Sequence, residues 1–454
     1  MKPFFLLIIV FTFQFVYSQI PTVFEKTYPA DIIKINTAIP TDQGYLAIGK
    51  STQNAGDFWL MATDSLGELR WQRLWGGIDF EFGGNISLDM NQNILVTGTS
   101  WTLSDDAGWP NIYLALLDPE GQMIWEKSLG THEVDKGIEA IATSDHGYAV
   151  IGESLLSDSS INTGVHLIKL DAKGDSVWGR TYGGPYMDHA TSIIECHDKG
   201  FLMGGMYSAS DALFSPTFYY LIRTDSLGNV LWSRKIDNPN YPSNLIRLVH
   251  DIVQVNDSLY AVTGFGSTFM INDAGDLLWI SDRAGLSIET TKDDGLVIAI
   301  EKRLTCFEKN GEIRWTKEYD DIFLRSVSHA LDGGFILAGT HDSTNSGLLM
   351  KVDCEGNVES PVLCTPTSIT RENKGTKITI YPNPSDGIFY VAPFQTAGAV
   401  SIFNSLGKDI IKEFIPPYQR VVIDISQYPR GIYYYEVHFS DGSTVSGKLV
   451  NTEK

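Results

Sequence analysis

The chain has 454 residues, of which 43% are hydrophobic and 11% are aromatic. This composition is sufficient for large buried cores in more than one domain. The formal net charge is −21 at pH 7. Nucleic acids and anionic membrane surfaces would repel such a chain, so we expect no nucleic-acid partner.

The first residues have the pattern of a secretory signal peptide. Lys2 supplies one positive charge before an apolar stretch, and Val16 and Ser18 stand at the −3 and −1 positions before Gln19. The stretch is too short for a comfortable membrane span. We therefore predict a signal peptide over 1–18, cleaved between Ser18 and Gln19, with a buried strand or an anchor as the alternative. No other segment is apolar for long enough to cross a bilayer, so we expect no transmembrane segment in the mature chain.

A phrase repeated along the chain is the main signal of the fold. It places Gly three residues after an Asp and Trp four residues after that Gly, as in 64–71. The seven copies begin at Asp64, Asp118, Asp171, Asp225, Asn272, Glu308 and Asp353. The last copy has Ser360 in place of Trp. Seven units at intervals of roughly 35–55 residues predict a repeat architecture.

Each unit divides into four short strands. In 138–184, an alternating segment, a turn at 145–147, an apolar run and two further strands follow one another without a helical period. This layout is typical of one propeller blade. Glycines such as Gly49, Gly264 and Gly339 recur in the apolar runs and suit inner strands, where backbones crowd together. We predict an all-β protein whose residues 19–364 form a seven-bladed β-propeller.

The Asp-x-x-Gly element favours a tight hairpin turn. Asp hydrogen-bonds the backbone two residues further on, and Gly supplies a positive φ. The Trp after it then lies on the outer strand, where it packs between neighbouring blades. A calcium or ligand loop at each Asp is the alternative, which the wide spacing of the carboxylates disfavours.

The two ends of the repeat region are complementary. The seventh unit lacks its Trp strand, whereas 24–28 near the mature N-terminus match 125–129 with Phe24 in place of Trp125. We therefore expect the N-terminal strand to complete the last blade, next to the chain around Cys354. Closing the ring removes exposed sheet edges.

The repeat resembles the Trp-docking repeat of the pyrroloquinoline quinone-type propellers. That resemblance implies the fold but not the cofactor, because the adjacent cysteines often found below the quinone are missing here. The spacing also differs from the Asp box of sialidases, in which Gly and Trp lie two and five residues after Asp. We expect no cofactor.

The C-terminal segment carries a second set of motifs. Its signature residues are Tyr381, Pro382, Asn383, Pro384, Gly387, Gly407, Gly431, Tyr433, Gly447 and Lys448. In this order they resemble the type A C-terminal sorting domain of the type IX (Por) secretion system of Bacteroidetes. The resemblance implies a small Ig-like β-sandwich over 377–454 that the type IX secretion machinery recognises and that is often cleaved. The alternating apolar strands agree with a sandwich, and 365–376 read as a polar linker. An ordinary adhesive Ig-like module is the alternative.

The four cysteines leave the disulfide pattern open. Cys354 and Cys364 flank the end of the seventh unit, and we predict a disulfide between them. Cys196 and Cys306 lie in different units on apolar strands, and we expect them to be buried free thiols. Three pairings are formally possible.

No catalytic constellation or metal site emerges from the sequence. We place His132, His146, His189 and His197 in turns or blade connections, without metal-ligand spacing. We therefore expect a binding or scaffold protein with an unknown surface ligand, a glycan or a protein, rather than an enzyme. It would reach the cell surface or the medium through the periplasm. The alternative is an extracellular glycan-active hydrolase or lyase with carboxylates at the mouth of the propeller channel.

Overall fold

The structure is a computed structural model of the chain. It describes residues 23–28, 32–51, 58–75, 81–101, 110–130, 135–155, 163–184, 186–210, 216–242, 245–330, 333–358, 380–381, 385, 387–391, 398–404, 409–415, 420–439 and 444–452. These residues form strands and turns without an α-helix, which confirms the all-β class. Among them there is no helix with the length and apolar character that a membrane span requires.

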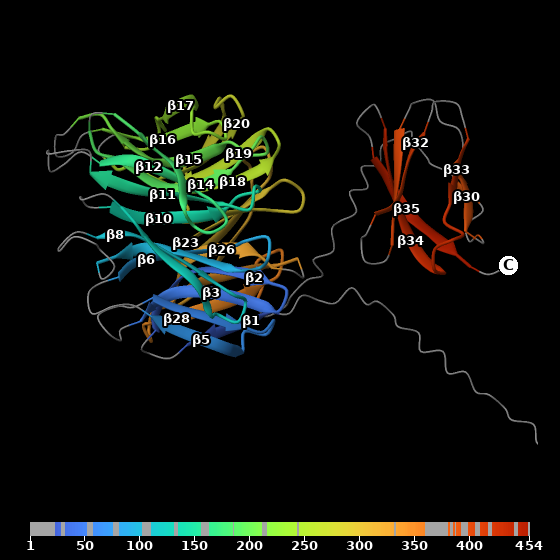
Figure 1. Cartoon of the computed structure of the whole chain (residues 1–454), viewed down its shortest axis with the longest axis horizontal. Coiled ribbons are helices and arrows are strands. Elements are labelled where there is room, and N and C mark those ends of the chain that lie inside the picture. Colours follow the sequence, from blue (N-terminus) through green and yellow to red (C-terminus); the bar gives the residue numbers. More distant parts are fainter. Residues whose placement is uncertain are drawn as a thin grey trace, which may run out of the picture. The chain divides into compact units, whose positions relative to one another are not determined.

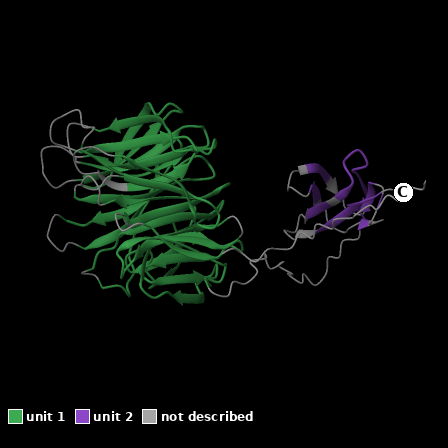
Figure 2. Ribbon diagram, turned by 90° about the horizontal axis from the view of Figure 1, so that it is seen from below, with its two compact units in different colours: residues 1–365 green, residues 366–454 purple. Residues whose placement is uncertain are grey.

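The chain divides into two compact units, drawn in different colours in Figure 2. Unit 1 runs to Thr365 and unit 2 begins at Pro366. The predicted signal peptide and the linker at 365–376 lie outside the described residues, so their bounds stay predictions.

Unit 1 consists of seven antiparallel sheets of four strands each, which confirms the seven-bladed propeller. From first to fourth strand, blades 1 to 6 are β2 (Ile32–Thr41), β3 (Gly44–Ser51), β4 (Phe58–Thr63), β5 (Leu69–Trp75); β6 (Glu81–Leu88), β7 (Ile94–Ser100), β8 (Asn111–Leu117), β9 (Met123–Leu129); β10 (Asp135–Ala142), β11 (Tyr148–Leu155), β12 (Thr163–Leu170), β13 (Ser176–Tyr182); β14 (Asp188–Glu195), β15 (Phe201–Ser208), β16 (Thr217–Thr224), β17 (Val230–Ile236); β18 (Val249–Asn256), β19 (Leu259–Gly264), β20 (Ser267–Asn272), β21 (Leu277–Ser281); β22 (Ser287–Thr290), β23 (Leu296–Ile300), β24 (Arg303–Phe307), β25 (Ile313–Glu318). Blade 7 is β26 (Ile322–His329), β27 (Phe335–His341), β28 (Ser346–Val352) and β1 (Phe24–Thr27).

The first strand of every blade lies nearest the propeller axis. Each of these strands contacts the first strands of the adjacent blades around the whole ring, and β10, β14 and β18 lie side by side in Figure 1. The second and third strands are almost fully buried, because both of their faces pack against neighbouring sheets. Fourth strands alternate between exposed and half-buried residues, as expected at the outer rim.

The N-terminal strand closes the ring, as the sequence predicts. β1 pairs antiparallel with β28, with Phe24 opposite Lys351 and Thr27 opposite Leu348. The partner strand thus ends just before Cys354. Tyr28 follows β1 and is buried, and its hydroxyl donates to the carbonyl oxygen of Gly67 in blade 1 at 2.9 Å. Blade 7 is therefore built from both ends of the repeat region.

A bulge recurs in the innermost strands. In six of the seven blades the first strand shifts register by one residue at least once, and only β22 pairs without a shift. The recurring glycines lie opposite these bulges, on second strands. A methyl group at Gly49 would lie 2.2 Å from the carbonyl oxygen of Lys34, and one at Gly339 would lie 2.0 Å from that of Phe323. The bulged carbonyl, rather than crowding at the axis itself, is what requires glycine.

Unit 2 is a small β-sandwich. One sheet contains β32 (Asp409–Ile415), β31 (Gly398–Phe403), β34 (Gly431–Phe439) and β35 (Thr444–Asn451), and the other contains β29 (Ile380–Tyr381), β30 (Ile388–Val391) and β33 (Val421–Asp424). Both sheets contribute to one buried core, which includes Phe389, Ile402 and Leu449. This two-sheet arrangement agrees with the predicted sandwich.

Candidate functional site

The repeated Asp caps the turn between the third and fourth strands. In blade 1, Asp64 Oδ1 accepts hydrogen bonds from the backbone N–H groups of Leu66 and Glu68, both at 2.9 Å. Gly67 completes the turn with a φ of +78°. The same capping occurs at Asp118, Asp171, Asp225 and Asp353. These carboxylates hold hairpin turns, and the part of the chain that the structure describes contains no cluster of three or more His, Cys, Asp or Glu suited to a metal ion.

The repeated Trp covers the Gly of the next blade. A methyl group at Gly121 would lie 2.8 Å from the ring of Trp71, and one at Gly67 would lie 2.6 Å from the ring of Phe24. Equivalent contacts join Trp125 to Gly174, Trp178 to Gly228, Trp232 to Gly275, Trp279 to Gly311 and Trp315 to Gly356. Each blade is thus fastened to the next, and Phe24 replaces the missing Trp of blade 7.

Substitution of one such glycine tests the contact. Gly228 has a φ of +78°, and an added methyl group would lie 2.8 Å from the ring of Trp178. We expect Gly228→Ala to lower the free energy of unfolding by about 1–3 kcal/mol, measured by urea denaturation. Gly179→Ala is the control, because its nearest neighbour would lie 3.4 Å away. Equal stability of the two variants would contradict the docking interpretation.

The third-strand residue opposite the Trp differs from blade to blade. In blades 1 to 7 it is Ala62, Leu116, Lys169, Arg223, Met270, Cys306 and, opposite Phe24, Lys351. Lys169 is buried, and its Nζ reaches Asp145 in the turn between the first and second strands at 2.9 Å. A long cation at this position therefore fills the space between adjacent turns.

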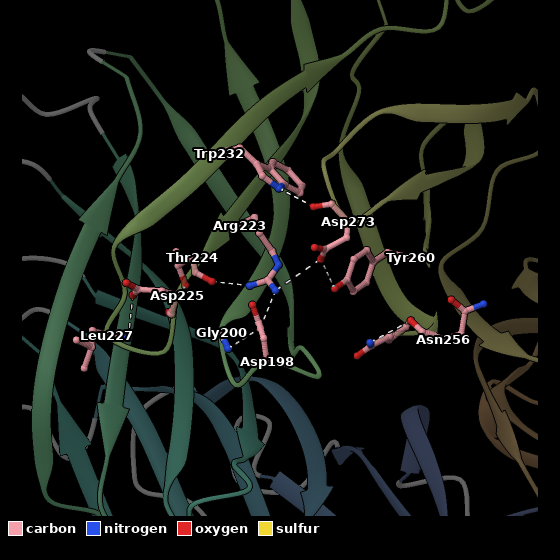
Figure 3. A network of polar contacts seen from close by, with 11 residues as sticks. Asp198, Gly200, Arg223, Thr224, Asp225, Leu227, Trp232, Asn256, Tyr260 and Asp273 are labelled. Carbon is pink, nitrogen blue, oxygen red and sulfur yellow. Dashed lines mark hydrogen bonds and ion pairs between the residues drawn. The ribbon is translucent and has the colours of Figure 1, made fainter. Parts of the chain in front are cut away.

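In blade 4 the side chain of Arg223 fills the equivalent space and has several partners (Figure 3). Its side chain is 1% exposed, and Nη2 lies 2.7 Å from Asp198 and 3.7 Å from Asp273 of the next blade. The Asp273 carboxylate also accepts a hydrogen bond from the Tyr260 hydroxyl at 3.0 Å. The backbone carbonyl oxygen of Asp273 accepts one from Trp232 Nε1 at 2.9 Å. Because a buried cation needs such partners, we assign the network a structural role between blades 4 and 5.

Beside two of these residues, Ala62 and Leu116, the space stays open. Beside Leu116 lies a cavity of about 390 Å³ between blades 2 and 3, which we call the 2–3 groove. Its walls are the turns at 89–93, 143–147 and 171–174, and its aromatic lining includes Trp125 and Tyr148. A smaller cavity of about 240 Å³ lies beside Ala62 between blades 1 and 2. The volume of the 2–3 groove is within the range of about 300–1,000 Å³ found for small-ligand sites.

The tryptophans at the two open grooves also differ from Trp232 and Trp279. The indole N–H groups of Trp232 and Trp279 donate to carbonyl oxygens of the next turn at 2.9 and 3.0 Å. Those of Trp71 and Trp125 are buried, and within the described residues they have no acceptor. An unsatisfied buried donor costs stability. In blades 1 and 2 an indole donor without a partner therefore lies near each cavity. Such local departures from good hydrogen bonding are typical of functional sites.

Polar side chains near the axis link the innermost strands. Asn85 Nδ2 donates to Glu139 Oε1 at 2.7 Å, and Glu139 Oε2 accepts from the N–H of Ile193 at 2.8 Å. Asp251 accepts from the N–H of Ile288 at 2.9 Å. Further ties join Ser287 with Val327 and Ser326 with Ala38. Several of these residues follow the bulges directly, so the bulge aims polar side chains at the next blade.

Two of these carboxyl groups have strongly raised pKa values. Burial raises the pKa of Glu139 to about 8, and the charge of Asp251 adds to the rise. Burial also raises the pKa of Asp251 to about 6, which its hydrogen bonds from Ile288 and Ser287 limit. Raised pKa values occur at catalytic acids, but the oxygens of both groups already accept backbone N–H groups. Their geometry fits interblade ties better than free acid and base groups.

The raised pKa of Glu139 predicts a pH dependence of stability. The unfolded chain releases this proton near pH 4.5 and the folded chain near pH 8. The folded state thus binds the proton more strongly, so the free energy of unfolding falls as pH rises from about 5 to 8. We expect Glu139→Gln to reduce this fall by up to a few kcal/mol, measured by urea denaturation at several pH values. An identical pH profile for both proteins would contradict the raised pKa.

The structure confirms some of the predictions made for individual histidines and cysteines and contradicts one. His146 and His197 lie in turns as predicted, but the placement of His189 is wrong: it lies on β14 and Nδ1 contacts Glu153. The sequence signal of the bulge beside it lies on the partner strand, where a methyl group at Gly205 would lie 1.7 Å from the His189 carbonyl oxygen. Cys196 and Cys306 are buried free thiols. His132, Cys364, Ser18 and Gln19 lie outside the described residues, so the Cys354–Cys364 disulfide and the cleavage site stay predictions.

Several signature residues of unit 2 have clear structural roles. Gly387 has a φ of +104°, and an added methyl group would lie 2.4 Å from Ser426 Cα. Tyr433 is buried and its hydroxyl donates to the Pro429 carbonyl. Tyr381, Gly431, Gly447 and Lys448 lie in β29, β34 and β35. Residues 382–384 and Gly407 lie outside the described residues.

The comparison with protein families identifies this segment. Residues 379–452 match the family described as the secretion system C-terminal sorting domain. Unit 2 carries a sorting domain. The match covers the signature residues from Tyr381 to Lys448 and confirms the resemblance seen in the sequence. No curated protein matches the chain.

Solved structures similar to the chain include several β-propellers. The WD40 β-propeller domain of Doa1 is 13% identical, with 73% of this chain and 96% of that chain covered and a TM-score of 0.49. A protein of unknown function from Bacteroides caccae is 14% identical, with 60% and 93% covered and a TM-score of 0.40. The extracellular domain of a one-component system from B. thetaiotaomicron is 11% identical, with 95% and 59% covered and a TM-score of 0.45. The assignment of seven blades to this chain follows from its own strand pairing.

Proposed function

We propose that the protein is a secreted or surface-displayed binding protein, whose sorting domain directs its export and whose propeller holds the ligand. The observation that carries the export role is the sorting-domain match over 379–452. In the sequence this segment follows the propeller, which is a separate compact unit. The signal-peptide pattern over 1–18 supports the same route.

The geometry favours binding over hydrolysis. A glycan hydrolase needs two carboxyl groups placed on either side of the scissile bond and free to exchange protons with it. Within the described residues, the two carboxyl groups with the most strongly raised pKa values, Glu139 and Asp251, accept backbone N–H groups of neighbouring blades. The open 2–3 groove, by contrast, presents an apolar floor with a polar rim, which suits ligand binding.

Two measurements test this function. Fusing residues 377–454 to a periplasmic reporter should carry it to the surface of a host with type IX machinery, and retention in the periplasm would contradict the export role. The full-length secreted protein should retain polysaccharides in affinity electrophoresis without releasing new reducing ends. Release of reducing ends that Glu139→Gln or Asp251→Asn abolishes would favour the hydrolase instead.

A further inference from the structure

The 2–3 groove combines an apolar floor with a rim that carries three unengaged polar side chains, and we propose that it binds a neutral, hydroxyl-rich sugar unit of a glycan. This inference rests on the proposed binding function and names its site and ligand class. It uses only turns and strands of blades 2 and 3 that the structure describes.

The floor of the groove suits the flat apolar face of a sugar ring. Leu116, Trp125 and Tyr148 line it, and the two aromatic rings meet edge to face with centroids 5.6 Å apart. Met90 and Ile124 extend this surface at the rim and are 63% and 50% exposed. Exposed apolar side chains beside an aromatic pocket are typical of a binding surface.

The rim supplies hydrogen-bonding groups of both kinds. Asp89 Oδ1 holds the local turn by accepting from the N–H groups of Asn91 and Asn93 at 2.7 and 2.9 Å. This fixes the backbone at Asn91. The side chains of Asn91, His146 and Lys173 make no hydrogen bond or ion pair to another described residue. A sugar hydroxyl both donates and accepts, so it is a suitable partner for an amide, an imidazole and an ammonium group.

Charge and backbone geometry narrow the ligand class. The rim carries the opposite charges of Asp89 and Lys173, so it does not select for a strongly charged ligand. The walls of the groove are the closed turns at 89–93, 143–147 and 171–174, and its volume of about 390 Å³ suits a compact ligand better than an extended peptide. A compact, uncharged ring with hydroxyl groups on its circumference fits both conditions.

The chain contains its own example of a closed groove. In blade 3, the residue equivalent to Leu116 is Lys169. Its side chain crosses the equivalent space of that blade and reaches Asp145. Leu116→Lys therefore imitates a neighbour that folds well while filling the cavity. Ala62→Lys is the matched control, because Ala62 occupies the same register beside the smaller cavity between blades 1 and 2.

The experiment uses the full-length protein with cellohexaose, mannohexaose and xylohexaose as neutral probes and polygalacturonate as the anionic probe. Isothermal titration calorimetry should show binding of at least one neutral probe. Leu116→Lys should weaken it by at least about tenfold, whereas Ala62→Lys should leave it within about twofold. Met90→Ser, an exposed change that leaves the fold intact, should weaken it by about threefold or more without lowering Tm.

Each outcome bears on the site or on the function. Binding that Leu116→Lys does not affect, binding of polygalacturonate alone, or no binding of any probe would overturn the proposed site or its ligand class. If Leu116→Lys fails to fold, the Met90→Ser result decides the site by itself. Release of reducing ends from the probes would instead overturn the proposed binding function, whatever the effect of Leu116→Lys.

Discussion

Removing residues 377–454 is expected to leave a folded propeller in the periplasm and abolish its delivery to the surface or medium. The propeller should fold without the deleted part, because its seven sheets and its ring closure are complete within unit 1, which ends at Thr365. The export machinery would lack the segment that matches the sorting-domain family. Cell fractionation and immunoblotting, in a host with type IX machinery, measure the loss.

A point variant separates loss of the sorting domain from loss of its fold. Gly387→Val places a branched side chain at a φ of +104° and against Ser426, so unit 2 should unfold while unit 1 is unchanged. We expect the same export defect as in the truncated protein. Val422→Thr, at a site 49% exposed, is the control and should be exported normally. Normal surface delivery of the truncated protein would mean that unit 2 is a binding module.

Deleting residues 19–30 is expected to destabilise the propeller far more than an ordinary terminal trim. The deletion removes β1 from blade 7, the ring of Phe24 from Gly67, and the buried Tyr28 with its hydrogen bond to the Gly67 carbonyl. It also exposes the edge of β28. Loss of a buried aromatic side chain alone costs about 3–5 kcal/mol, so we expect Tm to fall by roughly 5–10 °C.

Two substitutions refine this test. Phe24→Ala should reproduce much of the loss, because it removes the ring that covers Gly67. Phe24→Trp installs the residue found at this position in the other six blades and should be neutral or stabilising. Differential scanning calorimetry measures all three proteins. A Tm unchanged by the deletion would show that β1 does not hold the ring closed in solution.

The sequence predicts the architecture because the decisive signals are local and repeated. The Asp-to-Trp phrase specifies a turn and an outer strand within eight residues, so its seven copies count the blades. The similarity of 24–28 to 125–129 predicts ring closure, because a blade that lacks one strand needs it from elsewhere in the chain. The sorting domain is equally predictable from the sequence, because its signature residues lie within one short segment.

The grooves and the axial carboxyl groups follow only from the tertiary structure. Glu139 and Asp251 influence each other although they belong to blades 3 and 5. The recurring glycines mark the bulges beside these two residues but do not indicate which neighbour each carboxyl group reaches. Likewise, Leu116 matters because strand register places it opposite Trp125, while the turns of the next blade, some 30–60 residues further along the chain, supply the other wall. At this position Lys169 and Arg223 fill the space between adjacent turns, whereas Leu116 leaves it open. Local sequence patterns determine the blades of this protein, whereas packing between blades decides where it has space for a ligand.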